Sequence, residues 1–115
     1  MTVTLNRKGY EHAKQLIEQG RVTRDELDDW SEAAPTADRE NTYLDRNGFD
    51  EYAEWFLGIR EDESEDTKGR YAFPYGDFSR VHRSGLIAAE VRAAQNDYDE
   101  IAKAARRLLD LIDAQ

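Results

Sequence analysis

The run FLGIREDESEDTKGRYAFP at residues 56–74 decides the fold class, because an otherwise helical pattern gives way there to strands. Residues 56–59 are aromatic or branched apart from one glycine, and residues 70–73 alternate polar with apolar side chains ahead of Pro74. The first pattern is typical of a short strand and the second of an edge strand. Between them, five acids in six residues at 61–66 predict a solvated loop. We therefore predict a small hairpin that pairs 56–60 with 70–74.

Apolar spacing predicts helices on both sides of this hairpin. We expect them over about residues 6–19, 23–34, 37–46, 49–56, 79–95 and 97–112. Asn6 is a good N-cap for the first helix and Gly20 a good residue just past its end. Thr23 and Glu26 have the spacing of a capping box for the second helix. The predicted fold is mostly α with a small β-hairpin (α+β), a compact single domain over residues 1–115 with five or six helices.

The last third of the chain is predicted to form two long helices. Asp77 or Ser79 is expected to cap the first of them, and its buried stripe is expected at Val81, Ile87, Ala88, Val91 and Ala94. Gly85 inside this helix predicts close approach by a neighbouring backbone or aromatic ring. Asp97 and Glu100 have capping-box spacing for the last helix. The buried stripe of the last helix is expected at Ile101, Ala105, Leu108 and Ile112.

The composition excludes several classes of function. The 115 residues include 16 Lys and Arg against 25 Asp and Glu, a net charge of −9 at pH 7, which argues against a general nucleic-acid coat or an anionic-membrane binder. The absence of cysteine excludes disulfides, thiolate metal sites and thiol nucleophiles. No apolar run reaches the roughly 18 residues that a membrane span requires, and no secretory signal opens the sequence. We therefore expect a cytoplasmic protein.

The best candidate site is a basic island at residues 68–83, interleaved with aromatic side chains. Its candidate binding residues are Lys68, Arg70, Tyr75, Asp77, Arg80, His82 and Arg83. Cations beside aromatic faces can stack on bases or bind phosphate, and a binding surface would place the cations on one face next to an exposed Tyr75. In the alternative interpretation, Tyr71, Phe73 and Phe78 are core residues, and the arginines pair with the acids at 61–66. The sequence leaves both interpretations open.

No catalytic or metal motif accompanies this island. His82 is the plausible general base and lies one helical turn from Ser79, yet acyl transfer would also require an orienting acid and an oxyanion hole, and the sequence shows neither. In the alternative interpretation His82 is a structural histidine bonded to a carbonyl group or to Asp77. The segment 45–50 lacks the ligand at position 5 and the Gly at position 6 of a calcium loop. No phosphate-loop, dinucleotide or zinc motif is present, so we expect no cofactor and no metal.

The run from Asp66 to Phe78, followed by Val81-His82-Arg83, resembles a family of small bacterial proteins without an assigned function. The shared motif is T-K-G-R-Y-x-F-P-Y-G-D-F-x-x-V-H-R, preceded by an aromatic segment that ends in L-G, and the likeness covers about residues 40–95. This resemblance implies no activity. A looser likeness to short phage-derived modules rests on residues 71–74 and 93–95, and the acidic first half does not fit it.

Three functional hypotheses follow from the sequence. The leading one is a small cytoplasmic non-enzymatic domain, protein-binding or regulatory, with an unknown protein partner. The alternative is binding of a nucleic acid or a phosphate ligand through residues 68–83. The third is an enzyme that uses His82 and Asp77. The sequence predicts no membrane partner and does not define an oligomeric state.

Overall fold

The computed structural model describes residues 3–115 and has the predicted α+β fold. Within these residues, five α-helices pack with a three-stranded antiparallel sheet and a separate two-stranded parallel pair. The strands are β1 (Val3–Leu5), β2 (Val22–Thr23), β3 (Phe56–Arg60), β4 (Tyr71–Pro74) and β5 (Val81–His82). The helices are α1 (Arg7–Glu18), α2 (Trp30–Ala33), α3 (Ala37–Ala53), α4 (Arg83–Gln95) and α5 (Asp99–Asp113), with 3-10 turns at Leu27–Asp29 and Lys68–Arg70. No described helix is long and apolar enough to cross a membrane.

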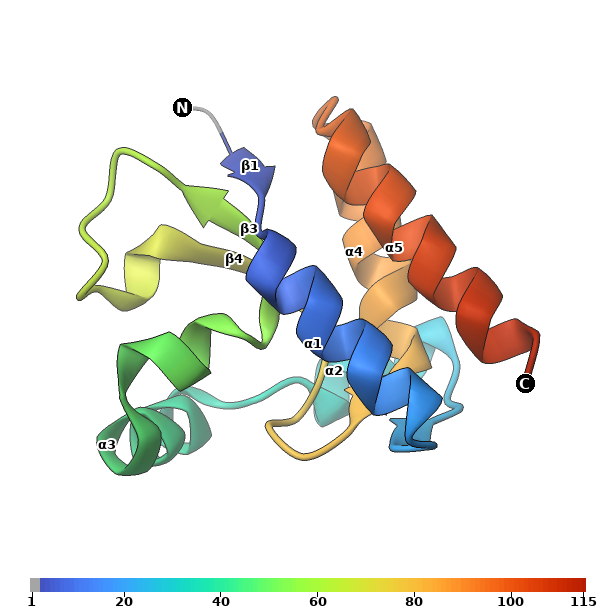
Figure 1. Cartoon of the computed structure of the whole chain (residues 1–115), viewed down its shortest axis with the longest axis horizontal. Helices are drawn as coiled ribbons and strands as arrows, with labels where there is room; N and C mark the ends of the chain where they lie inside the picture. Colours follow the sequence, from blue (N-terminus) through green and yellow to red (C-terminus); the bar gives the residue numbers. More distant parts are fainter. Residues whose placement is uncertain (1–2) are drawn as a thin grey trace.

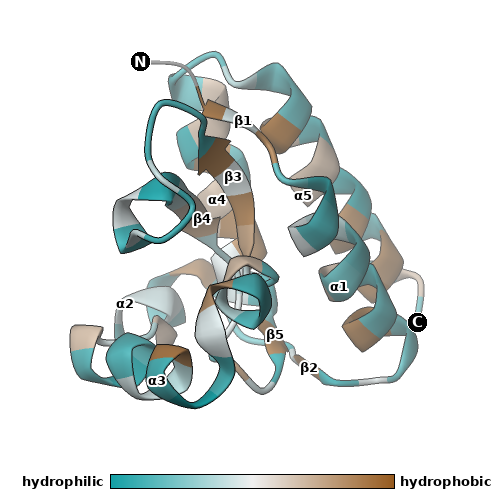
Figure 2. Ribbon diagram, turned by 60° about the vertical axis from the view of Figure 1, so that its left-hand side comes forward, coloured by the Kyte–Doolittle hydropathy of each residue, from teal (hydrophilic) through white to brown (hydrophobic). Residues whose placement is uncertain are grey.

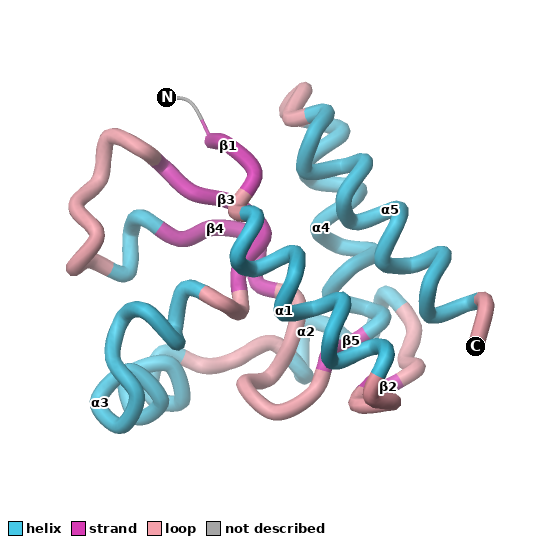
Figure 3. The backbone as a smooth tube through the Cα atoms, in the orientation of Figure 1, coloured by secondary structure: helices cyan, strands magenta, loops and turns pink. Residues whose placement is uncertain are grey.

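The predicted hairpin is confirmed. Strand β3 pairs antiparallel with β4, with Gly58 opposite Ala72 and Ile59 opposite Tyr71. The sheet order is β1-β3-β4, so β3 is central and β4 is the edge strand that Pro74 suggested. Strand β1 was not predicted, because its three residues are too few to show a strand period. Figure 3 shows the three strands beside one another, and the sheet contacts both α5, through β1 and β3, and α4, through β4.

Helix α1 crosses the front of the molecule between the sheet and α5 (Figure 1). Asn6 precedes it, but its side chain forms no cap. Instead, the buried Asn6 amide donates to the carbonyl oxygens of Ala53 and Phe56, at 2.8 and 2.9 Å. A Cβ on Gly9 would collide with the Phe56 carbonyl, so the glycine permits the close crossing of α1 over β3. Gly20 has φ of +77°, as expected for a residue just past a helix end.

Helix α3 contains the predicted break. Gly48 has φ of 81° and ψ of 173°, so the helix is interrupted there and resumes toward Ala53. Thr36 caps its start by accepting from the Arg39 N–H at 3.2 Å. The break turns the second half of α3, which carries Tyr52, into the core beneath the sheet.

The expected capping box at Thr23 is wrong, because Thr23 lies in strand β2. Strand β2 pairs parallel with β5, with Thr23 beside His82. The capping box instead joins Glu26 and Asp29 around a 3-10 turn that leads into α2. The expected second helix is thereby reduced to this turn and the four residues of α2. Strand pairing between distant segments overrode a local capping signal.

Helix α4 begins at Arg83, later than predicted, because Asp77 and Ser79 belong to a turn and residues 81–82 form β5. Its buried face is therefore rotated from the expected stripe and consists of Ser84, Gly85, Leu86, Ala89 and Ala93. Val91 is 43% exposed. The expected close approach at Gly85 is confirmed: a Cβ there would lie 2.8 Å from the Tyr75 carbonyl oxygen and 2.9 Å from the Trp30 ring.

Helix α5 has the predicted buried stripe. Ile101, Ala105, Leu108 and Ile112 are all buried, and they pack against α4 and α1. The expected cap at Asp97 is wrong, because Asp97 has φ of 61° and Tyr98 precedes the helix without a side-chain cap. In Figure 2 the hydrophobic residues of β3 lie in the interior, while the outer faces of α1 and α3 are largely hydrophilic.

Candidate functional site

The basic residues of the 68–83 island do not converge. Lys68 forms an ion pair with Glu40 at 3.0 Å, and Arg83 pairs with Asp113 at 3.1 Å. Arg70 and Arg80 donate to backbone carbonyl oxygens instead, Arg70 to Glu63 at 2.8 Å and Arg80 to Val22 at 2.9 Å. The island is thus divided among four separate places in the fold. The expected pairing of its arginines with the carboxylates at 61–66 is also wrong, since Arg70 contacts only a main-chain oxygen there.

A binding surface at residues 68–83 required an exposed Tyr75, and Tyr75 is fully buried. Its ring stacks on Trp55 at 5.7 Å, and its hydroxyl donates to the Glu54 carbonyl oxygen at 2.7 Å. Phe73 and Phe78 are half-buried against the core, as the structural interpretation of the segment predicted. Tyr75 therefore belongs to the core and not to a binding surface.

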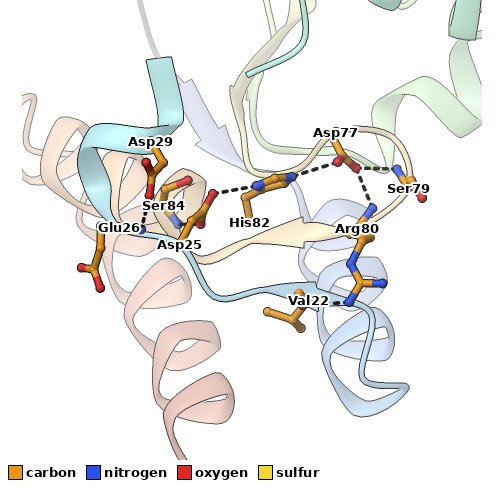
Figure 4. Close-up of polar contacts among 9 residues, drawn as sticks. All are labelled: Val22, Asp25, Glu26, Asp29, Asp77, Ser79, Arg80, His82 and Ser84. Carbon is orange, nitrogen blue, oxygen red and sulfur yellow. Dashed lines mark hydrogen bonds and ion pairs between the residues drawn. The ribbon is translucent and has the colours of Figure 1, made fainter. Parts of the chain in front are cut away.

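His82 and Asp77 do come together, and a third residue joins them. The His82 ring lies between two carboxylates, with Nδ1 2.8 Å from Asp25 and Nε2 2.8 Å from Asp77 (Figure 4). Asp25 follows β2, His82 ends β5, and Asp77 opens the turn before β5. The parallel β2–β5 pair therefore positions all three groups. We call Asp25, His82 and Asp77 the imidazole cluster.

The charges of the imidazole cluster follow from its contacts. Both ring nitrogens face a carboxylate oxygen, so both can donate only when the ring is an imidazolium. Burial alone would lower the pKa of His82, but the hydrogen bonds to Asp25 and Asp77 outweigh it and raise that pKa above 6.5. Burial likewise opposes ionisation of the two aspartates, yet their hydrogen bonds lower both carboxyl pKa values below 3.8. The contacts therefore favour an imidazolium held by two carboxylates.

Asp77 also fixes the turn that follows it. Its Oδ1 accepts from the N–H groups of Ser79 at 2.9 Å and Arg80 at 2.7 Å. Phe78, which lies between Asp77 and Ser79, has φ of 67°, in a region that bulky residues rarely occupy. A strained backbone of this kind persists only where its surroundings enforce it, and such strain is concentrated at functional sites. Through Asp77, the imidazole cluster holds Phe78 in this position.

A groove of about 570 Å³ lies between this turn and the first half of α3. Its lining residues are Asp38, Arg39, Thr42, Tyr43, Arg46, Asn47, Asp77, Phe78 and Ser79. Its volume falls within the range typical of small-ligand pockets. Of the candidate residues named from the sequence, Asp77 lines this groove. Asp77 is therefore shared by the groove and the imidazole cluster, whereas His82 and Asp25 do not line the groove.

An aromatic pair forms one wall of the groove. Tyr43 of α3 stacks on Phe78 of the turn, with ring centroids 4.5 Å apart and planes 13° from parallel. The Tyr43 hydroxyl accepts from the Trp55 indole N–H at 3.2 Å, which ties the wall to the core. Half-buried rings with a fixed orientation can contact an apolar or planar group at little entropic cost.

Two arginines at the groove have no side-chain partner within residues 3–115: Arg39 and Arg46 of α3. The other arginines between residues 20 and 90 each donate to a carbonyl or carboxylate oxygen, namely Arg21, Arg24, Arg60, Arg70, Arg80 and Arg83. Arg39, Tyr43 and Arg46 have helical i, i+4, i+7 spacing, so this face was readable in the predicted helix at 37–46. No sequence signal linked it to Asp77.

Comparisons with protein-family models, curated proteins and solved structures give no match. The resemblance to the bacterial family with the T-K-G-R-Y motif stays a prediction. Within residues 3–115, no group of three His, Asp or Glu side chains is arranged to hold a metal ion. The geometry of the groove and of the imidazole cluster therefore carries the functional argument.

Proposed function

We propose that the protein is a non-enzymatic binding domain that takes a short acidic segment of a partner protein in the groove between α3 and the turn at 77–80. The observation that carries this proposal is the pair Arg39 and Arg46, which line the groove and whose guanidinium groups have no partner in the described part of the chain. Guanidinium groups bind carboxylates strongly through paired hydrogen bonds. The absence of cysteine supports a cytoplasmic setting, and the motif resemblance supports a bacterial one.

The spacing of the arginines favours an extended ligand. Seven residues separate Arg39 from Arg46, which is about 10 Å along a helix axis. In a polyproline II segment, acids three positions apart lie on one side and about 9 Å apart. Such a segment can place one carboxylate at each arginine and an apolar side chain against Tyr43 and Phe78.

The same geometry argues against the two rival functions. His82 is 8% exposed and both of its nitrogens are held by carboxylates, so no ring nitrogen is free to take a proton from a substrate. A nucleic-acid backbone would meet the carboxylates of Asp38 and Asp77 in the groove and the net charge of −9 beyond it. A protein segment with only two acids is repelled much less.

Fluorescence anisotropy with a labelled peptide tests the proposal. The probe is Gly-Glu-Pro-Phe-Glu-Gly, and the matched peptide carries glutamine in place of both glutamates. We expect saturable binding of the acidic peptide that weakens with salt, and at least tenfold weaker binding by the double variant Arg39→Gln, Arg46→Gln.

The control variant removes the same charge elsewhere. Lys103→Gln with Arg107→Gln alters two exposed residues of α5, outside the groove, and should change the peptide affinity less than twofold. Equal binding of the two peptides, or equal loss in the two double variants, would overturn the proposal. Binding of a short oligonucleotide that the Arg39 and Arg46 variant abolishes would replace it with the nucleic-acid hypothesis.

A further inference from the structure

A second pocket lies where the sheet meets the junction of α4 and α5, and it shares no residue with the groove. It has a volume of about 270 Å³ and is lined by Val3, Arg60, Ala72, Phe73, Arg92, Asn96 and Tyr98. No acidic side chain is among these lining residues, although the chain contains 25 Asp and Glu. The pocket therefore joins two guanidinium groups, an amide and a phenol.

The polar groups of the pocket retain free hydrogen-bonding capacity. Arg92 and the Tyr98 hydroxyl have no side-chain partner within residues 3–115, and Arg60 uses only Nη1, which donates to the Gly69 carbonyl oxygen at 2.9 Å. An arginine in the last turn of a helix is also favoured by the helix dipole, which alone would explain Arg92. The dipole does not explain why Arg60, from the opposite side of the pocket, faces the same space.

The carbonyl groups at the end of α4 would repel an anion if they were free, and they are occupied. The Asn96 side-chain amide and backbone N–H both donate to the backbone carbonyl oxygen of Arg92, at 2.8 and 3.1 Å. The N–H of Tyr98 donates to the carbonyl oxygen of Ala93 at 2.8 Å, and the N–H of Asp97 donates to that of Ala94 at 3.3 Å. The helix end is thus closed by the chain itself.

One residue that lines the pocket has a strained backbone. Phe73, which lines it from β4, has φ of 62°. Asp97, between the lining residues Asn96 and Tyr98, has φ of 61°. The described residues contain one other non-glycine residue with positive φ, Phe78, and it borders the groove. Asp97 lies just past the end of α4, where a left-handed residue is an ordinary helix cap, whereas Phe73 and Phe78 are bulky residues that rarely adopt such a conformation and each lines one of the two pockets.

We propose that this pocket binds a small anion with at least two negative charges, a phosphate or a small dicarboxylate, between Arg60 and Arg92. Arginine suits such a ligand because its planar group donates paired hydrogen bonds to phosphate or carboxylate oxygens. The Tyr98 hydroxyl is a further donor at the wall. The site is independent of the peptide groove, and either can exist without the other.

The test uses inorganic phosphate and malonate as separate probes, each compared with sodium chloride at the same ionic strength. Chemical shifts of the arginine Nε–H groups and of the Asn96 amide are followed by NMR. We expect saturable shifts at Arg60, Arg92 and Asn96 with phosphate, malonate or both, and the two probes separate the phosphate source from the carboxylate source. Shifts that match those of chloride, or that grow without saturation, would overturn the proposal.

Variants assign the binding to this pocket. Arg92→Gln should weaken the apparent affinity at least tenfold, and it should fold like the parent because the Arg92 side chain forms no hydrogen bond within residues 3–115 and is exposed. Arg107→Gln on the exposed face of α5 is the matched control and should change the affinity less than twofold. Equal affinity of the Arg92→Gln protein and the parent would refute the site. Peptide binding at the groove should be the same in both, so the two proposals fail separately.

Discussion

The contact between α4 and α5 is apolar and local in sequence, whereas the contact around β2 and β5 is polar and joins distant segments. Helices α4 and α5 pack against each other with one short turn between them, and Leu86, Ala89 and Ala93 of α4 are buried in the same core as Leu108 of α5. The imidazole cluster instead joins residues 57 positions apart. Apolar packing depends on volume and shape, whereas a buried polar cluster depends on the presence of every partner. The two regions should therefore fail in different ways.

The largest effect is expected in the apolar region. Leu108 is fully buried, so Leu108→Ala should lower the free energy of unfolding by about 3–4 kcal/mol through lost contacts and a cavity. Val91→Ala is the control on the partner helix, because Val91 is 43% exposed and should change stability by less than about 0.5 kcal/mol. Urea denaturation measures both. A Val91 variant as unstable as the Leu108 variant would mean that the buried face of α4 is the one first predicted from the sequence.

The imidazole cluster should give the next largest effect. Asp25→Ala leaves the Ser84 N–H and the His82 Nδ1–H without their acceptor, which should cost about 2–3 kcal/mol. Asp28→Ala removes an exposed carboxylate from the next turn and serves as the control, within about 0.5 kcal/mol of the parent. If the double variant Asp25→Ala, His82→Gln loses as much unfolding free energy as the two single variants together, the two residues are not coupled. The idea that the cluster depends on every partner would then be wrong.

Gly85 lies where the two regions meet and should give an intermediate effect. Alanine would gain about 1 kcal/mol of helix propensity in α4. Its Cβ, however, would lie 2.8 Å from the Tyr75 carbonyl oxygen and 2.9 Å from Trp30. Overpacking of this kind costs about 1–3 kcal/mol, so Gly85→Ala should lower the melting temperature, and Gly85→Leu should lower it further. A raised melting temperature in the alanine variant would mean that the neighbouring groups move aside freely.

The smallest expected effect is the pH dependence of stability, which should come from the imidazole cluster and not from the apolar contact of α4 with α5. The raised pKa of His82 means that its contribution to stability is complete below pH 6.5 and is lost as the pH rises through the folded-state pKa. The lowered pKa values of Asp25 and Asp77 mean that their contribution is present above 3.8 and is lost as the pH falls through their folded-state values. Stability should therefore decline on both sides of mildly acidic pH. His82→Gln should flatten the alkaline decline, and Leu108→Ala should leave its shape unchanged.

The elements that the sequence predicted are those set by local periodicity. The hairpin of β3 and β4, the break at Gly48 and the buried stripe of α5 each depend on residues within one continuous stretch of the chain. The predicted start of α4 failed because Val81 and His82 fit a helical pattern as well as a strand. Only their pairing with β2 decides between the two, and that partner is remote.

The sequence indicated some residues of the candidate site, and it did not show which of them lie together in the fold. His82 and Asp77 were paired correctly as neighbours, but Asp25 was assigned to a helix start and carried no signal of its own. The basic island failed as a unit because charge spacing along a chain does not show which carbonyl or carboxylate each side chain reaches. The spacing of Arg39 and Arg46 places them on one face of the predicted helix. The sequence does not show that the turn at 77–80 lies opposite this face.

The position of α5 has a consequence for synthesis in the cell. The buried face of α1, which includes Leu16 and Ile17, packs against a helix that is made almost 100 residues later. The Arg24 guanidinium likewise donates to the carbonyl oxygen of Ile112. At about 5–20 residues per second, a ribosome leaves this apolar face uncovered for roughly 5–20 s. During that interval the nascent chain offers chaperones a hydrophobic helix, and α1 can dock fully only once α5 has emerged from the exit tunnel.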